Sequence, residues 1–384
     1  MNFAEMQTMA VKRFSSVPDP VNSSDSSSDD DQASHPSVTK KKPVPARSTK
    51  SITADEEKVL RALLKKWMAK NSTAYKCLAL TAFFWLASVS ILVRYQNFWS
   101  TLPVAASIVR NFMILHDSCH GSFLETRRQN AILSSIIQFF SQFQWTTWRE
   151  THNHHHTHLG DNSVIDTSLT VWFSEEEYAN MPLKMKIPFR LIRDPLLFFP
   201  IASAWVFFIS RPIIQFLPRY VVPIGFYFAF GLKVAFLYCV GGWMAGIVGL
   251  CLFHLQHQVN TPYRVSHDRK SLIDAGLYGS TLLAIRWPFT LITLGIEFHH
   301  IHHASVLVPS YHLAQCHAEG ERLNLFGGIN RVGGHRAVMS LFHALFKGNV
   351  KHSHADHHEY DAEHPPPSFA TFWPYSALGL FDQS

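Results

Sequence analysis

Residues 148–158 read Trp-Arg-Glu-Thr-His-Asn-His-His-His-Thr-His and form the most distinctive stretch of this chain. Within it, His152, His155 and His156 make an H-x-x-H-H pattern. Residues three and four positions apart lie on one face of a helix, about 5–6 Å from each other. A helix over this stretch would therefore direct three imidazoles toward one point. A cluster of this kind predicts a helical protein in which other histidine-bearing helices complete the same site.

Two further stretches repeat the pattern. His116 and His120 form H-x-x-x-H, and His299, His302 and His303 form a second H-x-x-H-H. Neutral imidazole suits Fe, Zn, Cu and Ni. The three boxes supply more nitrogens than the four ligands of one zinc ion, so their number fits two metal ions with four or five ligands each. Two redox metals near a bilayer favour O2 activation on a lipid substrate, although the number alone also allows zinc-dependent hydrolysis.

The hydrophobic residues, 47% of the chain, are clustered rather than spread. Residues 77–93, 98–115 and 220–255 are rich in Phe, Leu, Val and Ile, and such runs approach or exceed the ~20 residues that cross a ~30 Å hydrocarbon layer. We therefore predict an all-α integral membrane protein with membrane lipids as partners. The net charge of +6 is small for 384 residues and gives no indication of a nucleic-acid partner. Five scattered cysteines without C-x-x-C predict no disulfide framework.

Composition divides the chain into four parts. Residues 1–52 are rich in Ser, Asp and Lys and predict a disordered tail without a signal peptide. Residues 53–70 predict a basic amphipathic helix that begins with a capping box at Thr53. That helix would lie on an anionic leaflet or pack against the protein's own cytosolic domain. Residues 71–320 would form the membrane and catalytic domain, and residues 321–384 a His-rich, partly disordered cytosolic segment.

The basic residues before the first apolar run place the N-terminus in the cytoplasm. Residues 77–93 and 98–115 then form one hairpin, with the first histidine box at its exit. If all boxes serve one site, an even number of crossings separates the second box from the third. Residues 220–255, broken at Gly241-Gly242, would supply these two crossings and bring the total to about four helices in two hairpins. Lys233 would then lie inside the third span and would have to snorkel or face the bundle.

Three shorter apolar segments complete this topology. Residues 132–143 are too short to cross a membrane. Residues 196–208 and 281–296 are predicted to be interfacial or re-entrant, because the parity of the crossings leaves no place for them as spans.

The order of the three boxes resembles the membrane fatty acid desaturase and hydroxylase superfamily. His116-Asp117-x-x-His120-Gly121-Ser122-Phe123 is similar to the first box of acyl-lipid desaturases, and Trp148-Arg149 precedes the second box as it does there. The third box, followed by Pro309 and Tyr311, resembles the omega-6 (delta-12) type. The resemblance covers about residues 75–317.

This resemblance implies a cytosolic helical cap that holds a di-iron site. It also implies a ninth ligand, because the branch carries a Gln-His pair between the second and third boxes and Gln256-His257 matches it. The implied metal ligands are His116, His120, His152, His155, His156, His257, His299, His302 and His303. Histidines that fall off the box positions would be outer-sphere or solvent groups, namely His154, His158 and His300, and His254 is not assigned.

The same resemblance implies an O2-dependent desaturase that introduces a cis double bond into an acyl-lipid or acyl-CoA substrate. Cytochrome b5, or ferredoxin in a plastid, would supply electrons, since no His-Pro-Gly-Gly haem motif is present. The expected location is the endoplasmic reticulum membrane, with the site facing the cytosol. The alternatives are a hydroxylase on the same scaffold and a membrane metal-binding or transport protein. Glu297 and Ala304 depart from the pattern of the branch and leave the bond position open.

Overall fold

The structure is a computed structural model. It describes residues 51–161, 180, 182–192, 195–208, 217–257, 270–285 and 287–333. The chain divides into two compact units, Met1–Thr49 and Lys50–Ser384, and all described residues belong to the second. Nearly all of the predicted tail, and the His-rich segment after residue 333, lie outside the described residues.

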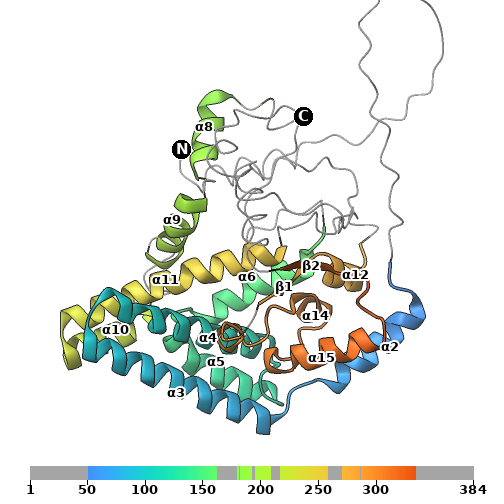
Figure 1. Cartoon of the computed structure of the whole chain (residues 1–384), viewed down its shortest axis with the longest axis horizontal. Coiled ribbons are helices and arrows are strands. Elements are labelled where there is room, and N and C mark those ends of the chain that lie inside the picture. The colour runs from blue at the N-terminus through green and yellow to red at the C-terminus, as the bar shows by residue number, and fades with distance from the viewer. Residues whose placement is uncertain are drawn as a thin grey trace, which may run out of the picture. The chain divides into compact units, whose positions relative to one another are not determined.

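Two long helices form an antiparallel hairpin. Helix α3 (Asn71–Tyr95) is followed by a 3-10 turn η1 (Phe98–Ser100) and by α4 (Thr101–His120), which runs back along it (Figure 1). Side chains link the pair at two levels. The Ser88 hydroxyl donates to the carbonyl of Pro103 at 2.9 Å, and Arg110 Nε donates to Thr81 Oγ1 at 2.8 Å. The hairpin places the N-terminal end of α3 beside the C-terminal end of α4.

A second hairpin is present, but its turn is not where the sequence predicts it. Helix α10 (Leu217–Phe230) meets α11 (Leu232–His257) at Gly231, whose φ of +87° suits glycine. Helix α11 continues through Gly241-Gly242, so the predicted break there is wrong. A Cβ at Gly241 would lie 2.7 Å from Val104 Cγ1, so this glycine allows close packing of α11 on α4. Lys233 is therefore exposed at the second residue of α11, at the end of that helix and not in its middle.

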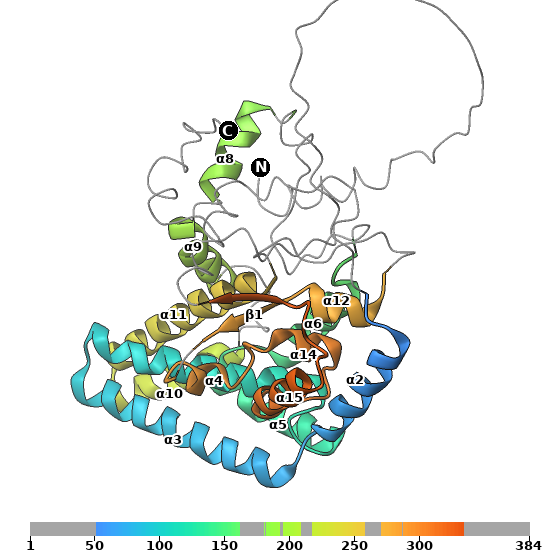
Figure 2. The same cartoon turned by 45° about the vertical axis from the view of Figure 1, so that its right-hand side comes forward.

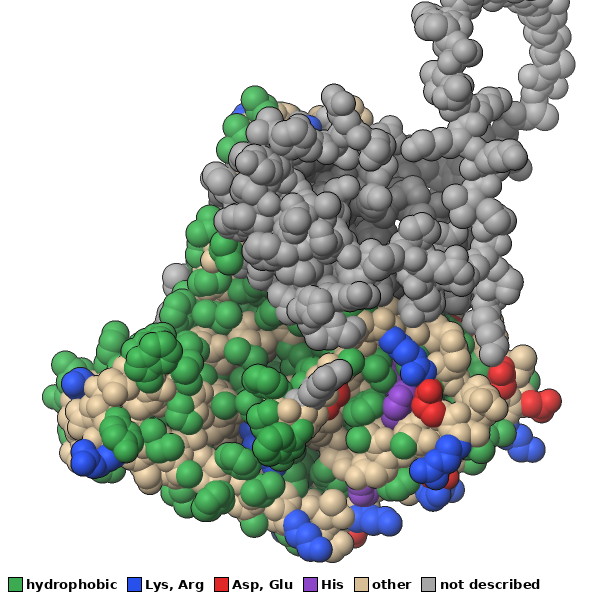
Figure 3. Space-filling model, in the orientation of Figure 1, with side chains coloured by type: hydrophobic (Ala, Val, Ile, Leu, Met, Phe, Trp, Pro, Cys, Tyr) green, Lys and Arg blue, Asp and Glu red, His purple; other side chains and the backbone are tan. Residues whose placement is uncertain are grey.

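Three helices in the described part of the chain are long and apolar enough to cross a membrane: Asn71–Tyr95, Phe98–His120 and Leu232–His257. Helix α10 has 14 residues, or about 21 Å, and is not among them. The structure thus supports three of the four predicted spans. Figure 3 shows hydrophobic side chains over the part of the molecule where α3 and α10 lie, while most acidic and basic side chains in this view gather toward α2 and α15.

Shorter helices flank these spans. Helix α5 (Arg127–Ser141) packs along α4, and α6 (Trp145–His158) returns beside it. Helix α8 (Leu183–Ile192) precedes α9 (Pro195–Phe208), which is joined to α11 where Trp243 Nε1 donates to the carbonyl of Pro200 at 3.0 Å.

The third histidine box lies in a compact arrangement of short elements. These are α12 (Leu272–Tyr278), β1 (Thr281–Ala284), α13 (Thr290–Thr293), α14 (His299–Ala304), α15 (Ser310–Arg322) and β2 (Asn330–Gly333). Strands β1 and β2 pair in parallel, with Thr281 opposite Asn330, so the protein is mostly helical and not all-α. The predicted interfacial segment 281–296 begins with this strand, because its backbone pairs with β2 and Asn330 Nδ2 donates to Thr281 Oγ1 at 2.7 Å.

Helix α2 (Ala54–Lys66) packs against α15 and the core of the same folded unit, which favours the second of the two predicted alternatives. Its capping box is present: the side chain of Thr53 accepts from Glu56 N, and Glu56 accepts from Thr53 N at 2.9 Å. Leu60, Leu63 and Leu64 are buried. At the end of the helix Trp67 Nε1 donates to Glu319 of α15 at 2.8 Å, and α2 and α15 lie side by side in Figures 1 and 2.

The described residues begin at Ser51, two positions before the N-cap Thr53 of α2. The Ser51 hydroxyl donates to the carboxylate of Asp274 in α12, and Ile52 N donates to the same carboxylate at 3.1 Å. Ile52 also packs on the hydrophobic core. Residues 51 and 52, predicted as part of the disordered tail, thus belong to the folded unit.

Candidate metal centre

All nine histidines that the sequence nominates lie on helices whose ends converge. The first box occupies the last turn of α4, and His257 is the last residue of α11. The second box lies on α6, and the third forms most of α14. Since α4 and α11 both end here, the site lies at one end of the bundle of long helices.

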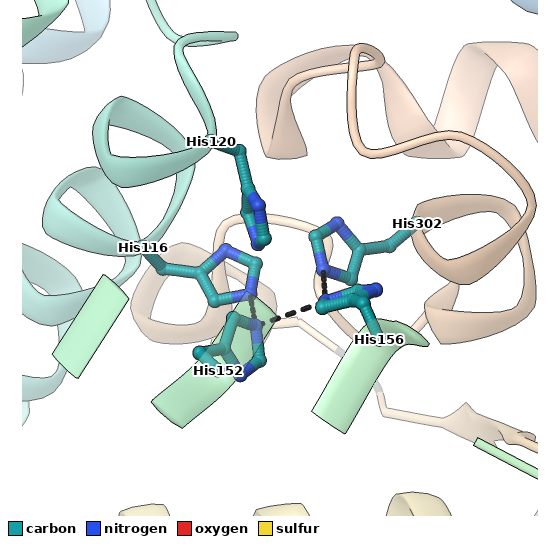
Figure 4. A group of neighbouring side chains, drawn as sticks. All are labelled: His116, His120, His152, His156 and His302. Carbon is teal, nitrogen blue, oxygen red and sulfur yellow. Dashed lines mark hydrogen bonds between the residues drawn. The ribbon is translucent and has the colours of Figure 1, made fainter. Parts of the chain in front are cut away.

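Five of these histidines form one group: His116, His120, His152, His156 and His302. One ring nitrogen from each lies within 4.8 Å of those of the others. Figure 4 shows their rings directed at a common centre. The Nε2 atoms of His116 and His152 are 3.1 Å apart, those of His152 and His156 are 3.0 Å apart, and those of His156 and His302 are 3.0 Å apart.

A second group contains His155, His257 and His303, again with ring nitrogens within 4.8 Å of one another. His299 adjoins it, because its Nε2 lies 2.9 Å from His257 Nε2 and 3.0 Å from His303 Nε2. The two groups are adjacent, since His155 and His156 are neighbours on α6 and the rings of His156 and His303 stack at 4.1 Å. The structure thus brings all nine nominated histidines together in groups of five and four.

The nitrogen positions fit metal binding. Adjacent ligands at right angles around a metal, with metal–nitrogen bonds of about 2.1 Å, have nitrogens about 3.0 Å apart. The observed Nε2–Nε2 distances of 2.9–3.2 Å match that separation. His120 Nε2 is buried and has no hydrogen-bond partner among the described residues. A buried nitrogen lone pair that faces four other imidazoles is the environment that a metal ion satisfies.

The surroundings of five of these imidazoles favour the neutral form that metal ligation requires. Burial, followed by the charge that neighbouring imidazoles would carry, lowers the pKa of His152 and His302 well below the ordinary value of histidine. The same two causes lower the pKa of His156, His299 and His303. The two groups contain no carboxylate or thiolate among the described residues. An all-imidazole donor set suits Fe, Zn, Cu or Ni.

A carboxylate within the first box orients one of these histidines, a role that the sequence analysis did not assign. Asp117 is buried, and its Oδ1 lies 2.9 Å from His116 Nδ1. Its other oxygen accepts from Ser310 N at 2.6 Å. A proton held on Nδ1 leaves the Nε2 lone pair free for a metal. The sequence feature that could have indicated this role is the carboxyl residue Asp117 directly after the box histidine His116.

The histidines outside the two groups have other surroundings. His154 is exposed on α6 and stacks at 4.0 Å on His158, which is half-buried. His300 is fully buried, and its Nε2 lies 3.2 Å from His317 Nδ1 on α15. His254 is buried near Phe198 and Phe199, and its Nδ1 donates to the carbonyl of Leu250 at 2.7 Å.

Glu297 and Ala304, the two residues at which the sequence departs from the pattern it resembles, lie beside the third box. Glu297 is buried, and its Oε2 accepts from Thr293 Oγ1 at 2.6 Å. Burial raises the pKa of this carboxyl group, partly offset by that hydrogen bond. Ala304 ends α14 against α12, where a Cβ at Gly276 would lie 2.7 Å from Ala304 N. The small side chain at position 304 suits this close contact of backbones.

Comparison with known proteins identifies the class. The sequence profile of the family described as Fatty acid desaturase matches residues 94–327, which is more than half of the chain. The chain therefore belongs to the fatty acid desaturase family.

Several curated proteins are similar to it. A "Fatty acid desaturase" of Bacillus subtilis (strain 168) is 27% identical over 256 residues, which cover 62% of this chain and 73% of the relative. An "sn-1 oleoyl-lipid 12-desaturase" of Picosynechococcus is 24% identical over 303 residues, covering 73% of this chain and 82% of the relative. Another of that name, from Synechocystis, is 28% identical over 102 residues, 25% of this chain and 28% of the relative. Membership of the family implies an oxidoreductase with a lipid substrate.

Proposed function

We propose that this protein is an O2-dependent desaturase that introduces a cis double bond at the delta-12 (omega-6) position of an acyl lipid. The observation that carries the proposal is the convergence of nine imidazoles, in groups of five and four, at the end of apolar helices. Two curated relatives are named as oleoyl-lipid 12-desaturases, which supports this bond position.

In this proposal the nine histidines ligate two iron ions. The first group of five would hold one ion, and His155, His257, His299 and His303 the other. Bound iron supplies O2 activation and the abstraction of hydrogen from two adjacent methylene groups. The chain's own residues hold the imidazoles neutral and oriented, Asp117 fixes His116, and the apolar bundle positions the acyl chain.

A fatty acid hydroxylase on the same scaffold is the second candidate, because both reactions begin with the same hydrogen abstraction. A metal-transport function has less support, since the histidines gather at helix ends and do not line a path through the bundle.

We further propose that the site faces the cytosol at the endoplasmic reticulum membrane and receives electrons from cytochrome b5 or, in a plastid, ferredoxin. Basic residues on this side offer docking positions for an acidic carrier. Lys66 is already paired with Glu319 at 2.7 Å, whereas Lys65, Arg127 and Arg128 are exposed. These three residues are therefore the stronger candidates.

The test is a fatty-acid profile of yeast that expresses the full chain, by gas chromatography–mass spectrometry with double-bond derivatisation. His155→Ala removes a nominated ligand and should abolish the new product. His154→Ala, which removes an exposed histidine of the same helix, should leave it unchanged. A new acid unsaturated at the twelfth carbon would support the proposal, whereas a hydroxylated acid would identify the second candidate. Full activity of His155→Ala would refute the ligand assignment.

A further inference from the structure

Helix α5 has the reverse of the polarity expected for a helix on the surface of a cytosolic cap. Its buried side carries Asn130, Ser134 and Ser141 beside a single buried isoleucine, Ile137, whereas Ile132 and Ile136 are each 53% exposed. A helix in water buries its apolar face. A helix against lipid can bury its polar face in the protein and expose its apolar face.

The buried polar side chains of α5 are satisfied within the protein. Ser134 Oγ donates to Ser118 Oγ of α4 at 2.9 Å. Asn130 Nδ2 donates to the carbonyl of Leu124 at 2.7 Å, and its Oδ1 accepts from Leu124 N at 2.9 Å. The helix is thus fixed with its polar side toward α4, so the exposure of its isoleucines follows from specific contacts.

The C-terminal end of α5 reaches deep into the bundle of long helices. Phe140 packs edge-on against Trp85, near the middle of α3, with ring centroids 5.0 Å apart. The next turn places Gln142 against α11, where a Cβ on Gly242 would lie 2.1 Å from Gln142 Oε1. Gly242 lies about four turns, or about 22 Å, before the histidine end of α11. The C-terminal end of α5 therefore lies far from the histidine end of the bundle, beside the middle of the long helices α3 and α11.

The turn after α5 is built as a turn at membrane depth must be. Non-helical backbone is tolerated there only where protein buries and satisfies it. Gln142 has a φ of 63° and is 2% exposed. Its carbonyl accepts from Arg219 Nη2 of α10 at 3.4 Å. The chain then returns as α6 toward the histidines.

We propose that α5 is a re-entrant membrane helix: it enters from the histidine side, turns back at Gln142, and lets lipid acyl chains cover the face formed by Ile132 and Ile136. Its 15 residues span about 22 Å, too short to cross. The exposed Arg127 and Arg128 at its start lie where the headgroups would be, and cationic residues are enriched at such boundaries on the cytoplasmic side. The first and second histidine boxes are thus joined by a segment that dips into the bilayer.

The test measures what surrounds these side chains and does not require turnover, so it is independent of the proposed reaction. The variants Ile132→Cys and Ile136→Cys, with Arg128→Cys as the control on the same helix, are spin-labelled in the full chain. They are reconstituted in phosphatidylcholine–phosphatidylglycerol vesicles, and the unsubstituted chain gives the background from native cysteines. Collision of each nitroxide with O2, which concentrates in hydrocarbon, is compared with collision with a water-soluble nickel complex.

Lipid contact predicts a ratio of O2 to nickel collisions that is several-fold higher at positions 132 and 136 than at position 128. Nickel collisions at 132 and 136 equal to those at 128 would place this face in water and overturn the proposal. Low collision rates with both reagents would mean that protein covers the face, and would overturn it as well.

Discussion

Asp117 links two parts of the site through its two carboxylate oxygens, one at His116 and one at Ser310 N. The change Asp117→Asn keeps the size of the side chain but weakens its hold on the Nδ1 proton of His116. Loss of such an outer-sphere partner costs about 10–100-fold in metal affinity or activity. We expect a corresponding loss of bound iron, measured by mass spectrometry of the purified protein at limiting iron. Glu125→Gln, an exposed change near the same helix end, is the control, and equal iron in both variants would contradict the role.

His317 gives the folded protein a dependence on pH. Burial, with a smaller contribution from Arg331, lowers its pKa to about 4, whereas an unfolded histidine titrates near about 6.5. Between these values the unfolded chain binds the extra proton, so the free energy of unfolding falls as the pH falls. His317→Gln should therefore lose less thermal stability between pH 7 and pH 5 than the parent chain does.

The measurement is the Tm of metal-free protein in detergent at both pH values. His154→Gln removes an exposed histidine and serves as the control. The same fall in Tm for His317→Gln and the parent would rule out His317 as a source of the pH dependence.

The histidines that the sequence nominated do converge, because their spacing of three and four residues is kept on the helices α6, α14 and the end of α4. It could not assign them to two groups. His155 and His156 are adjacent in the sequence but belong to different groups, and only the crossing of α6 with α4, α11 and α14 decides which is which. The burial of His300 against His317 could likewise not be predicted from the sequence, because it depends on where α15 packs.

Among the elements near the site, α12 and α14 are in close backbone contact. A Cβ at Gly276 would lie 2.7 Å from Ala304 N and 2.8 Å from the carbonyl carbon of His303. Both are backbone atoms, so Gly276→Ala must push α14 away and displace His303. Overpacking of this kind costs about 1–3 kcal/mol.

We expect Gly276→Ala to lower both the Tm and the iron content. Gly225→Ala in α10, where nothing lies within 4 Å of the added Cβ, should change neither. Unchanged iron content in Gly276→Ala would show that α14 tolerates the shift.

Element boundaries were predicted where a local signal existed and missed where packing decides. The capping box at Thr53 and Glu56 is such a local signal, and the helix starts there. The pair Gly241-Gly242 looked like a turn, yet both glycines serve contacts with Val104 and Gln142, while the single Gly231 makes the turn. Strand β1 was missed because its partner, β2, is 49 residues away in the sequence.

At the scale of the whole molecule, the first described residues tie the start of the folded unit to α12. A chain that begins at residue 53 lacks the hydrogen bonds of Ser51 and Ile52 to Asp274, whereas a chain that begins at residue 51 retains them. Leaving a buried carboxylate without such partners costs about 1–3 kcal/mol. We expect a lower Tm for the shorter chain.

Asp274→Asn tests the origin of that loss. If the carboxylate is responsible, removing residues 51 and 52 should cost less in the Asp274→Asn chain. An equal loss of Tm in both chains would point to the packing of Ile52 instead.

The bond from Asp117 to Ser310 has a consequence for how the protein is made. The two residues are 193 positions apart, so the first histidine box leaves the ribosome long before the residue that fixes its orienting carboxylate. The third box also emerges late, and both groups of histidines need members of it. A nascent chain can therefore insert its first hairpin into the membrane early, but it has no complete place for a metal ion until synthesis has passed Ser310. Loading with metal is in this sense a step of maturation that follows membrane insertion.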